Sequence, residues 1–389
     1  MRILHTSDWH LGRSFHREGM LAHQAAYIDH LLEVVESERV DLVVVAGDVY
    51  DRALPQVDAV RLADDSLVRL AHSRARVVLT SGNHDSAQRL GFSSRLIDAS
   101  GVHIRADAAT VGTPVELADE HGPVAVYGLP YLDPLALAGP WSLPGRSHEA
   151  ALAAAMGKVR RDLVARSPGT RAVVLAHAFV AGGQPSESER DISVGGVSRV
   201  ATSTFDGIDY VALGHLHGAQ TLSDRVRYSG SPLAYSFSEV GQTKGSWLVD
   251  LAADGSVAAD FVAAPVPRAL ARIHGHLEAL LADPDLARYD ASWVHATVTD
   301  PVRPTQPMER LRRRFPHALV LAFEPEGADA LPVPSARPGA RSDHQIALEF
   351  VRELRGAPAS DAESALLQQA CDACTDDTDV DTLFTVGAQ

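Results

Sequence analysis

The first hundred residues alternate short apolar segments with longer amphipathic ones, and this alternation restricts the possible folds more than any other feature. Strand-like segments at 2–8, 41–48 and 76–85 are separated by segments at 20–40 and 57–75 whose apolar residues recur at helical spacing. This β-α-β-α-β order predicts parallel strands joined by right-handed crossovers. We expect functional groups at the carboxyl ends of these strands, where open α/β sheets bind ligands.

Strand-like segments dominate after about residue 102. They lie at 101–104, 123–130, 171–178, 209–215, 225–231 and 246–264, and the last contains an Asp-Gly turn typical of an antiparallel hairpin. We therefore expect an α/β two-sheet sandwich flanked by helices over residues 1–265. A second β-α-β-α-β order over 266–326 predicts a small α+β capping domain, to which we assign DNA contact.

The last part of the chain resembles an appendage. Residues 327–341 are rich in proline, glycine and alanine and predict a linker. Residues 342–389 predict two short helices and an acidic tail, with Ser360 and Glu363 forming a capping box for the second helix. An apolar stripe on the first helix consists of Ile346, Phe350, Val351 and Leu354. This stripe needs a partner to cover it.

Composition narrows the function classes. The net charge of −15 argues against a protein that coats nucleic acid by bulk electrostatics, although a partner subunit can supply a basic surface to a nuclease. Two cysteines exclude a disulfide framework and suit a reducing compartment. No secretion signal and no apolar run of membrane-spanning length is read, so we expect a cytoplasmic protein.

Metal-ligating side chains gather at the ends of the expected strands. The segments are SDWH with Asp8 and His10, GDVYD with Asp48 and Asp51, GNHD with Asn83, His84 and Asp85, LAHAF with His177, and GHLH with His215 and His217. Alternate residues of an extended segment point the same way, so the last two histidines leave their strand together. Carboxylate, amide and imidazole ligands without thiolate favour Mn, Fe or Zn. Seven of these side chains are counted as ligands, and seven ligands suit two ions about 3.5–4 Å apart that share a carboxylate. The seven are Asp8, His10, Asp48, Asn83, His177, His215 and His217.

The order D-x-H, G-D-x-x-D, G-N-H-D, a lone histidine and G-H-x-H resembles the calcineurin-like metallophosphoesterase superfamily. More narrowly, ILHTSDWHLGR (3–13), GDVYDRALP (47–55) and residues 228–251 resemble the SbcD family of bacterial nuclease subunits. The resemblance implies a partner, an SbcC-type coiled-coil ATPase, for which residues 342–389 are the expected binding segment. It also implies a homodimer within a heterotetramer.

The resemblance assigns roles to individual residues. Asp48 would bridge two divalent ions, with Mn²⁺ favoured; Asp8, His10 and His217 would complete one site, and Asn83, His177 and His215 the other. His84 would be the catalytic histidine that protonates or positions the phosphodiester. Asp85, in the same catalytic loop, is expected to orient its neighbours as a hydrogen-bond acceptor. Archaeal relatives carry histidine where this chain has Asp51, whose role stays open.

The implied activity is a 3′–5′ double-strand exonuclease and single-strand endonuclease in an ATPase-coupled DNA repair and recombination complex, hydrolysing phosphodiesters by a two-metal mechanism. The alternatives are a phosphodiesterase for small phosphoesters and a repair scaffold with structural metals. The extra domain, linker and terminal helices favour the nuclease, because a minimal small-molecule enzyme has no use for them.

Arginines follow several metal motifs. We predict that Arg13, Arg17, Arg52 and Arg89 hold the DNA backbone beside the ions, since guanidinium groups bind phosphate well. His5 lies close to Asp8, but its position inside a strand predicts a structural role.

Overall fold

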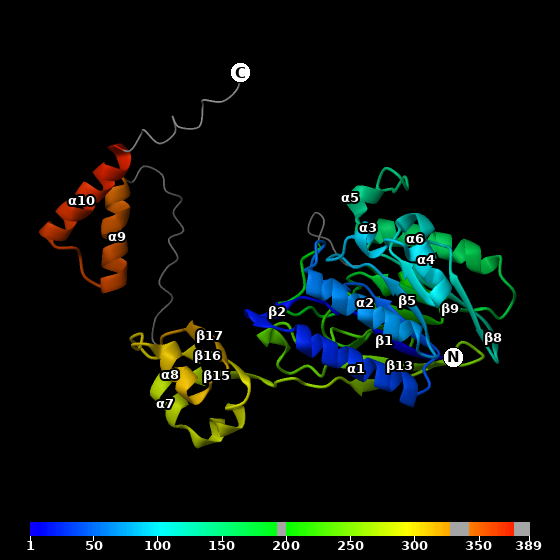
Figure 1. Cartoon of the computed structure of the whole chain (residues 1–389). Helices are drawn as coiled ribbons and strands as arrows, with labels where there is room; N and C mark the ends of the chain where they lie inside the picture. The colour runs from blue at the N-terminus through cyan, green and yellow to red at the C-terminus, as the bar shows by residue number, and fades with distance from the viewer. Residues whose placement is uncertain (193–199, 327–341, 377–389) are drawn as a thin grey trace. The chain divides into compact units, whose positions relative to one another are not determined.

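The computed structural model describes residues 1–192, 200–326 and 342–376 (Figure 1). Contacts between residues divide the chain into two compact units, residues 1–326 and 327–389. The predicted linker, 327–341, and the acidic end from 377 onward lie outside the described residues.

The first sheet has six strands. Their order is β14 (Val257–Ala263), β13 (Gly245–Leu251), β1 (Arg2–Thr6), β4 (Leu42–Ala46), β5 (Arg76–Thr80) and β6 (Val102–Arg105). Strands β1, β4, β5 and β6 are parallel, as the alternating pattern predicts, whereas β13 and β14 form the predicted antiparallel hairpin. Helices α1 (Leu21–Ser37) and α2 (Val57–Ala71) pack against each other and cover one face (Figure 1).

The second sheet also has six strands. Their order is β11 (Gln220–Thr221), β12 (Val226–Tyr228), β10 (Tyr210–Gly214), β9 (Arg171–His177), β8 (Gly122–Leu129) and β7 (Val115–Asp119). The four central strands are parallel, and the two edge strands are antiparallel to their neighbours. Helix α6 (His148–Val164), for which the sequence analysis made no prediction, packs Leu152 and Met156 against this sheet.

The two sheets face each other across a common core. Val44 of β4 and Val126, Val173 and Tyr210 of the second sheet belong to it. His5 is buried in the same layer, where its Nδ1 accepts a hydrogen bond from the Tyr210 hydroxyl (2.8 Å) and its Nε2 donates to the Leu213 carbonyl (3.1 Å). Its predicted structural role is confirmed. The predicted fold class, a two-sheet sandwich flanked by helices, is also confirmed.

Short elements connect these layers. They are β2 (Ser14–Phe15), β3 (Glu18–Gly19), α3 (Ala87–Leu90), α4 (Ser94–Ile97), α5 (Pro134–Leu137) and the 3-10 turn η4 (Phe237–Glu239). The hairpin of β2 and β3 carries Phe15, whose ring centroid lies 5.0 Å from that of Phe237 and 5.1 Å from that of Trp293. This aromatic cluster joins the sandwich to the next part of the chain.

A small parallel sheet follows the sandwich. It consists of β15 (Leu270–Gly275), β16 (Trp293–Val298) and β17 (Ala318–Phe323), with α7 (Leu277–Ala282) and α8 (Pro307–Arg314) between the strands. Leu277, Val294, Leu311 and Phe315 form a separate core. The observed element order is the β-α-β-α-β order that the sequence predicts for 266–326.

The second unit contains helices α9 (Asp343–Arg355) and α10 (Asp361–Asp376), which contact each other. A capping box of Ser342 and Gln345 begins α9, and Gly356, with φ of 70°, ends it. The side chains of Ile346, Phe350, Leu354 and Leu366 are exposed. Within the described ranges, no helix is both long enough and apolar enough to cross a membrane.

A buried ion pair secures the end of the second sheet where β9 begins. The Arg171 guanidinium donates to both carboxylate oxygens of Asp119, at 2.5 and 3.0 Å. These hydrogen bonds hold the pKa of Asp119 well below its usual range, although burial acts in the opposite direction. Because the folded-state pKa lies below the unfolded value of about 3.9, the pair stabilises the protein above that pH and the stabilisation is lost as pH falls through the folded-state pKa.

Asp119→Asn is therefore expected to cost about 3–5 kcal/mol at neutral pH, because Arg171 keeps a buried, unpaired charge. Urea unfolding of the native chain and the variant, at neutral pH and at acid pH, measures the difference. The difference in unfolding free energy between the two proteins should decrease as the pH falls below about 4, where protonation begins to remove the stabilising charge of the native carboxylate. An equal difference at both pH values would contradict this account.

Candidate metal centre

One rim of the sandwich collects the seven predicted ligands. Asp8, Asp48 and Asn83 follow β1, β4 and β5 by two or three residues, whereas His177 ends β9 and His215 follows β10. Three groups of side chains there offer atoms close enough to hold a metal ion. The groups are Asp8, His10 and His217; His10, Asp48 and His84; and Asp8, Asp48 and His177.

The backbone of this rim adopts a conformation that is unusual for residues with side chains. Asp8, His10, Asp48 and His215 all have positive φ, at 52°, 47°, 50° and 104°. Such residues cost free energy, and they persist where surrounding contacts hold them. Here the Asp8 amide donates to the Gly47 carbonyl (3.1 Å) and the His10 amide to the Asp48 carbonyl (3.0 Å), so the two loops hold each other.

His10 and His217 face each other. Their Nε2 atoms are 3.0 Å apart, and the His10 Nε2 lies 3.7 Å from Asp48 Oδ2. Two nitrogen ligands about 2.1 Å from one cation, at a right angle, are separated by about 3.0 Å. The buried Nδ1 of His10 has no hydrogen-bond partner among the described residues and lies 3.7 Å from Asp51 Oδ1. The facing Nε2 atoms fit a cation shared by the two rings.

Asn83, His177 and His215 converge on the other side of Asp48. The His177 Nδ1 donates to the Ala46 carbonyl (2.9 Å), which turns its Nε2 toward Asn83 Oδ1 (2.8 Å) and Asp48 Oδ2 (3.4 Å). The His215 Nδ1 lies 3.2 Å from the same amide oxygen. Acceptor atoms at these distances repel unless a proton or a cation lies among them, so this cluster also fits a metal ion.

The pKa shifts of the side chains at the rim also favour a bound cation. Burial raises the pKa of Asp8 to about 6 and lowers the pKa values of His10 and His215 well below the usual range. Burial also acts to lower the pKa of His177, but the Asp48 carboxylate outweighs it and raises the value to about 9. Buried carboxylates beside neutral imidazoles are costly without a cation.

His84 lies against Asp48 and His10. Its backbone amide donates to Asp48 Oδ1 (2.8 Å), and its Nδ1 donates to the Asp51 carbonyl (2.7 Å). The Nε2 atom is thereby turned toward the rim, 4.0 Å from Asp48 Oδ2. The ring centroids of His84 and His10 are 4.6 Å apart.

Asp85 has a different environment. Its carboxylate accepts hydrogen bonds from the backbone amides of Val49 (3.0 Å), Tyr50 (2.8 Å) and Gly82 (2.9 Å). Burial raises its pKa to about 7. These contacts tie the GDVYD and GNHD loops together, which favours an orienting role over participation in the reaction.

The four predicted phosphate-binding arginines are placed differently. Arg13 donates to the Ser188 carbonyl (2.8 Å), and its guanidinium lies over the Tyr235 ring. Arg52 is exposed, with its Nε 3.5 Å from Asp51 Oδ2. Arg89 is also exposed and donates to the Ala53 carbonyl (2.8 Å), whereas Arg17 is exposed in the turn between β2 and β3. Their proposed contact with DNA stays a prediction.

The residues behind His217 were not predicted from the sequence. Ser188 Oγ lies 2.5 Å from the His217 Nδ1, and Glu189 accepts a hydrogen bond from the His217 amide (2.7 Å). Glu239 and Lys244 lie next to Ser188 and His217 respectively. These two belong to the segment 228–251 that carries the family resemblance, which was the available signal. Ser188 and Glu189 lie in an irregular loop and gave none.

Comparisons with solved structures give distant similarities. A novel archaeal phosphodiesterase shares 13% identity over 67% of this chain and 100% of its own, with a TM-score of 0.31. GAP50, an anchor in the inner membrane complex of Plasmodium, shares 14% identity over 68% and 84%, with a TM-score of 0.42. A β-glucosidase from Exiguobacterium marinum shares 7% identity over 83% and 89%, with a TM-score of 0.23. Such low scores assign no function.

Family sequence models match two parts of the chain. The calcineurin-like phosphoesterase model matches residues 1–219, which is more than half of the chain. The model described as the type 5 capsule protein repressor C-terminal domain, characteristic of SbcD, matches residues 266–350. Together they confirm the resemblance drawn from the motifs. The chain therefore belongs to the calcineurin-like phosphoesterase family, as a member of the SbcD type.

Proposed function

We propose that this chain is the nuclease subunit of a DNA repair and recombination complex, acting as a 3′–5′ double-strand exonuclease and a single-strand endonuclease. Its family makes it a metal-dependent phosphoesterase. The observation that carries the proposal is the convergence of two ligand clusters on Asp48, whose Oδ2 lies 3.7 Å from the His10 Nε2 and 3.4 Å from the His177 Nε2.

Each cluster would hold one divalent ion. Asp8, His10 and His217 would bind the first ion, Asn83, His177 and His215 the second, and Asp48 both; we favour Mn²⁺. Such ions would lower the pKa of a bound water and would neutralise charge on the phosphoryl oxygens. The mixed oxygen and nitrogen donors suit this class of ion.

His84 would act on the leaving group. Its Nδ1 is occupied by the Asp51 carbonyl, so Nε2 is the atom available to the substrate. Burial lowers the pKa of the imidazole, but an approaching phosphodiester anion favours its protonated form. A protonated Nε2 can then donate to the departing 3′-oxygen or hold a phosphoryl oxygen.

DNA and a protein partner would also contact residues outside the ligand set. We propose that four arginines contact the DNA backbone and that residues 266–326 serve as the capping domain. The arginines are Arg13, Arg17, Arg52 and Arg89.

The α9–α10 hairpin exposes Phe350 and Leu354, with 60% and 73% of their surface accessible, and such apolar helical surfaces suit a helical partner. We propose that this partner is an SbcC-type coiled-coil ATPase in a heterotetramer that contains two copies of this chain.

The direct test offers three substrates to the purified chain with MnCl₂: a linear duplex, a single-stranded circle and bis(p-nitrophenyl) phosphate. We expect the duplex to be shortened from its 3′ ends and the circle to be cut. Excess EDTA should abolish all cleavage, and added Mn²⁺ should restore it, because the buried ligand set needs its cations.

The pattern of cleavage separates the alternatives. Hydrolysis of the small ester without either DNA would support the phosphodiesterase for small phosphoesters. Failure to hydrolyse any substrate with Mn²⁺ bound would support the scaffold. Cleavage that persists in EDTA would contradict a metal-dependent reaction at this rim.

A further inference from the structure

A connected set of polar side chains lies behind His217, on the side away from His10. We call it the His217 network; it consists of Ser188, Glu189, Glu239 and Lys244. Ser188 and Glu189 lie in the loop after β9, Glu239 ends η4, and Lys244 directly precedes β13. Ser188, Glu239 and Lys244 are buried. Such burial of polar groups is costly unless each one has a partner.

The hydrogen bonds of this network have a defined direction. Ser188 Oγ lies 2.5 Å from the His217 Nδ1 and 2.5 Å from Glu239 Oε1. A carboxylate only accepts, so the single hydroxyl proton of Ser188 is donated to Glu239. The hydroxyl oxygen is then an acceptor toward His217, and Nδ1 carries the ring proton. The Nε2 atom therefore presents its lone pair to the rim.

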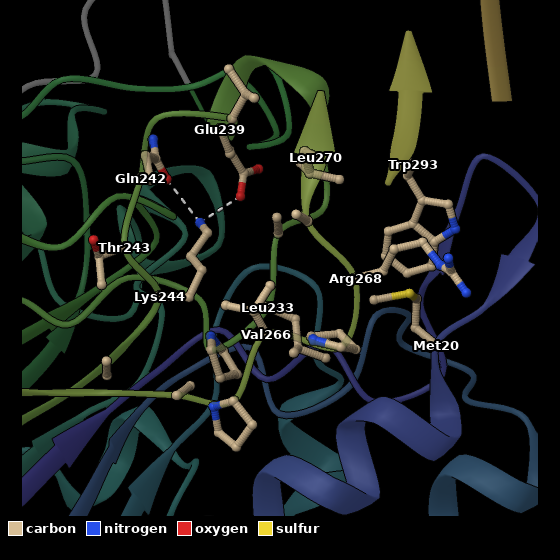
Figure 2. A pocket seen from close by; sticks show the side chains of 18 residues that line it. Met20, Leu233, Glu239, Gln242, Thr243, Lys244, Val266, Arg268, Leu270 and Trp293 are labelled. Carbon is tan, nitrogen blue, oxygen red and sulfur yellow. Dashed lines mark hydrogen bonds and ion pairs between the residues drawn. The ribbon is translucent and has the colours of Figure 1, made fainter. Parts of the chain in front are cut away.

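Lys244 forms an ion pair with Glu239. Its Nζ lies 2.5 Å from Glu239 Oε2 and donates to Gln242 Oε1 (2.8 Å). Figure 2 shows these contacts at the edge of a cavity of about 250 Å³, whose other walls include the apolar side chains of Leu233 and Trp293. Among the described residues that line this cavity, Glu239 is the one carboxylate, so it is the counter-charge available to the ammonium there.

The polar atoms of His217 are held from several sides. Its backbone amide donates to Glu189 Oε1 (2.7 Å), its carbonyl accepts from Lys244 Nζ (2.7 Å), and its Nδ1 meets Ser188. The remaining polar atom is Nε2, which lies 3.0 Å from the His10 Nε2. Partners of this kind orient a metal-ligating imidazole and fix its tautomer.

We propose that Ser188, Glu239 and Lys244 are positioning residues that fix the tautomer and ring orientation of His217, and thereby set the affinity of the ion held with Asp8 and His10. This inference rests on the proposed function, because it takes His217 as a metal ligand. The ion held by Asn83, His177 and His215 should not depend on the network.

The test is a Mn²⁺ titration of the full chain, followed by the electron paramagnetic resonance signal of free Mn²⁺. The native chain is expected to bind two ions. Ser188→Ala should weaken one of them by about 10- to 100-fold and leave the other unchanged. Ser188→Thr keeps the hydroxyl and should retain most of the affinity. Glu239→Gln should resemble Ser188→Ala.

Stability needs a separate control, because Glu239→Gln leaves a buried ammonium unpaired. If that variant does not fold, Glu239→Gln combined with Lys244→Met removes both charges. This double variant still tests the affinity of the ion held by Asp8, His10 and His217. Asp119→Asn breaks the comparable ion pair with Arg171, at the opposite end of β9 from His177. It should lower stability and leave both Mn²⁺ affinities unchanged.

The outcomes separate the two proposals. A native chain that binds no Mn²⁺ overturns the proposed function. A native chain with two ions and a Ser188→Ala variant with unchanged affinities overturns the positioning role alone. An equal loss of Mn²⁺ affinity in Ser188→Thr and Ser188→Ala also overturns that role, since the hydroxyl would then not be the cause. An equal loss of Mn²⁺ affinity in Asp119→Asn and Ser188→Ala overturns it as well, because lowered stability would then explain both losses.

Discussion

Replacing His84 with asparagine is expected to lower kcat for DNA cleavage by about 10²- to 10⁴-fold, the usual contribution of a general acid. Asparagine keeps the backbone amide that donates to Asp48 Oδ1, and its side-chain amide can still donate to the Asp51 carbonyl. The variant therefore removes Nε2 with little disturbance of the bridging carboxylate. Both Mn²⁺ ions should remain bound.

Two substrates distinguish between the possible roles of His84. The 3′-oxygen of DNA is a poor leaving group that needs a proton, whereas p-nitrophenolate leaves readily without one. A general acid therefore predicts a large loss on DNA and a small loss on bis(p-nitrophenyl) phosphate. Equal losses on both would instead indicate that His84 holds a phosphoryl oxygen. His121→Asn, in the turn between β7 and β8, is the matched control and should leave kcat unchanged.

The second large effect is expected at Gly214, the last residue of β10. A Cβ atom there would lie 1.9 Å from the Ala46 carbonyl oxygen and 3.0 Å from the His177 Nδ1. The Gly214→Ala variant must therefore move β4 and β10 apart, which we expect to cost about 3 kcal/mol of unfolding free energy. The shift also breaks the hydrogen bond from His177 to Ala46, so the second ion should be held more weakly.

Urea unfolding and the Mn²⁺ titration measure both consequences at Gly214. Gly241→Ala is the matched control, because a Cβ atom at Gly241 meets nothing within 4 Å. It should change the unfolding free energy by less than about 0.5 kcal/mol. Similar unfolding curves for the two variants would mean that the strands do not approach as closely as the structure shows.

The position of the ligands at strand ends explains why they could be predicted from the sequence. Asp8, Asp48 and His177 follow or end apolar runs that are unmistakable as buried strands, and the carboxyl ends of parallel strands lie together. The fold class follows from the same runs. The assignment of single ions to single residues needed the family resemblance, because alternation along a strand does not say which distant side chains meet.

Other parts of the molecule give weak signals. Helix α6 buries Ala151 and Ala155 among its core contacts, and alanine contrasts little with polar neighbours, so the helical period is faint. Ser188 and Glu239 act through His217 rather than on the ions, and they are 29 and 22 positions away from it. Ser188 lies in an irregular loop, where polar residues are typically exposed to solvent, and gives no signal. Glu239 ends the turn η4, and its signal was the family resemblance of residues 228–251.

The left-handed backbone at Asp8, His10, Asp48 and His215 has an evolutionary consequence. Each such residue carries about 1–3 kcal/mol of conformational cost, which the rest of the sandwich offsets. In a lineage that no longer needed the reaction, glycine at these positions would relieve that cost. Substitutions that abolish the activity would then also stabilise the chain. Glycine at any of these four positions is therefore expected to ease the backbone while removing a metal-ligating side chain or displacing it from the rim.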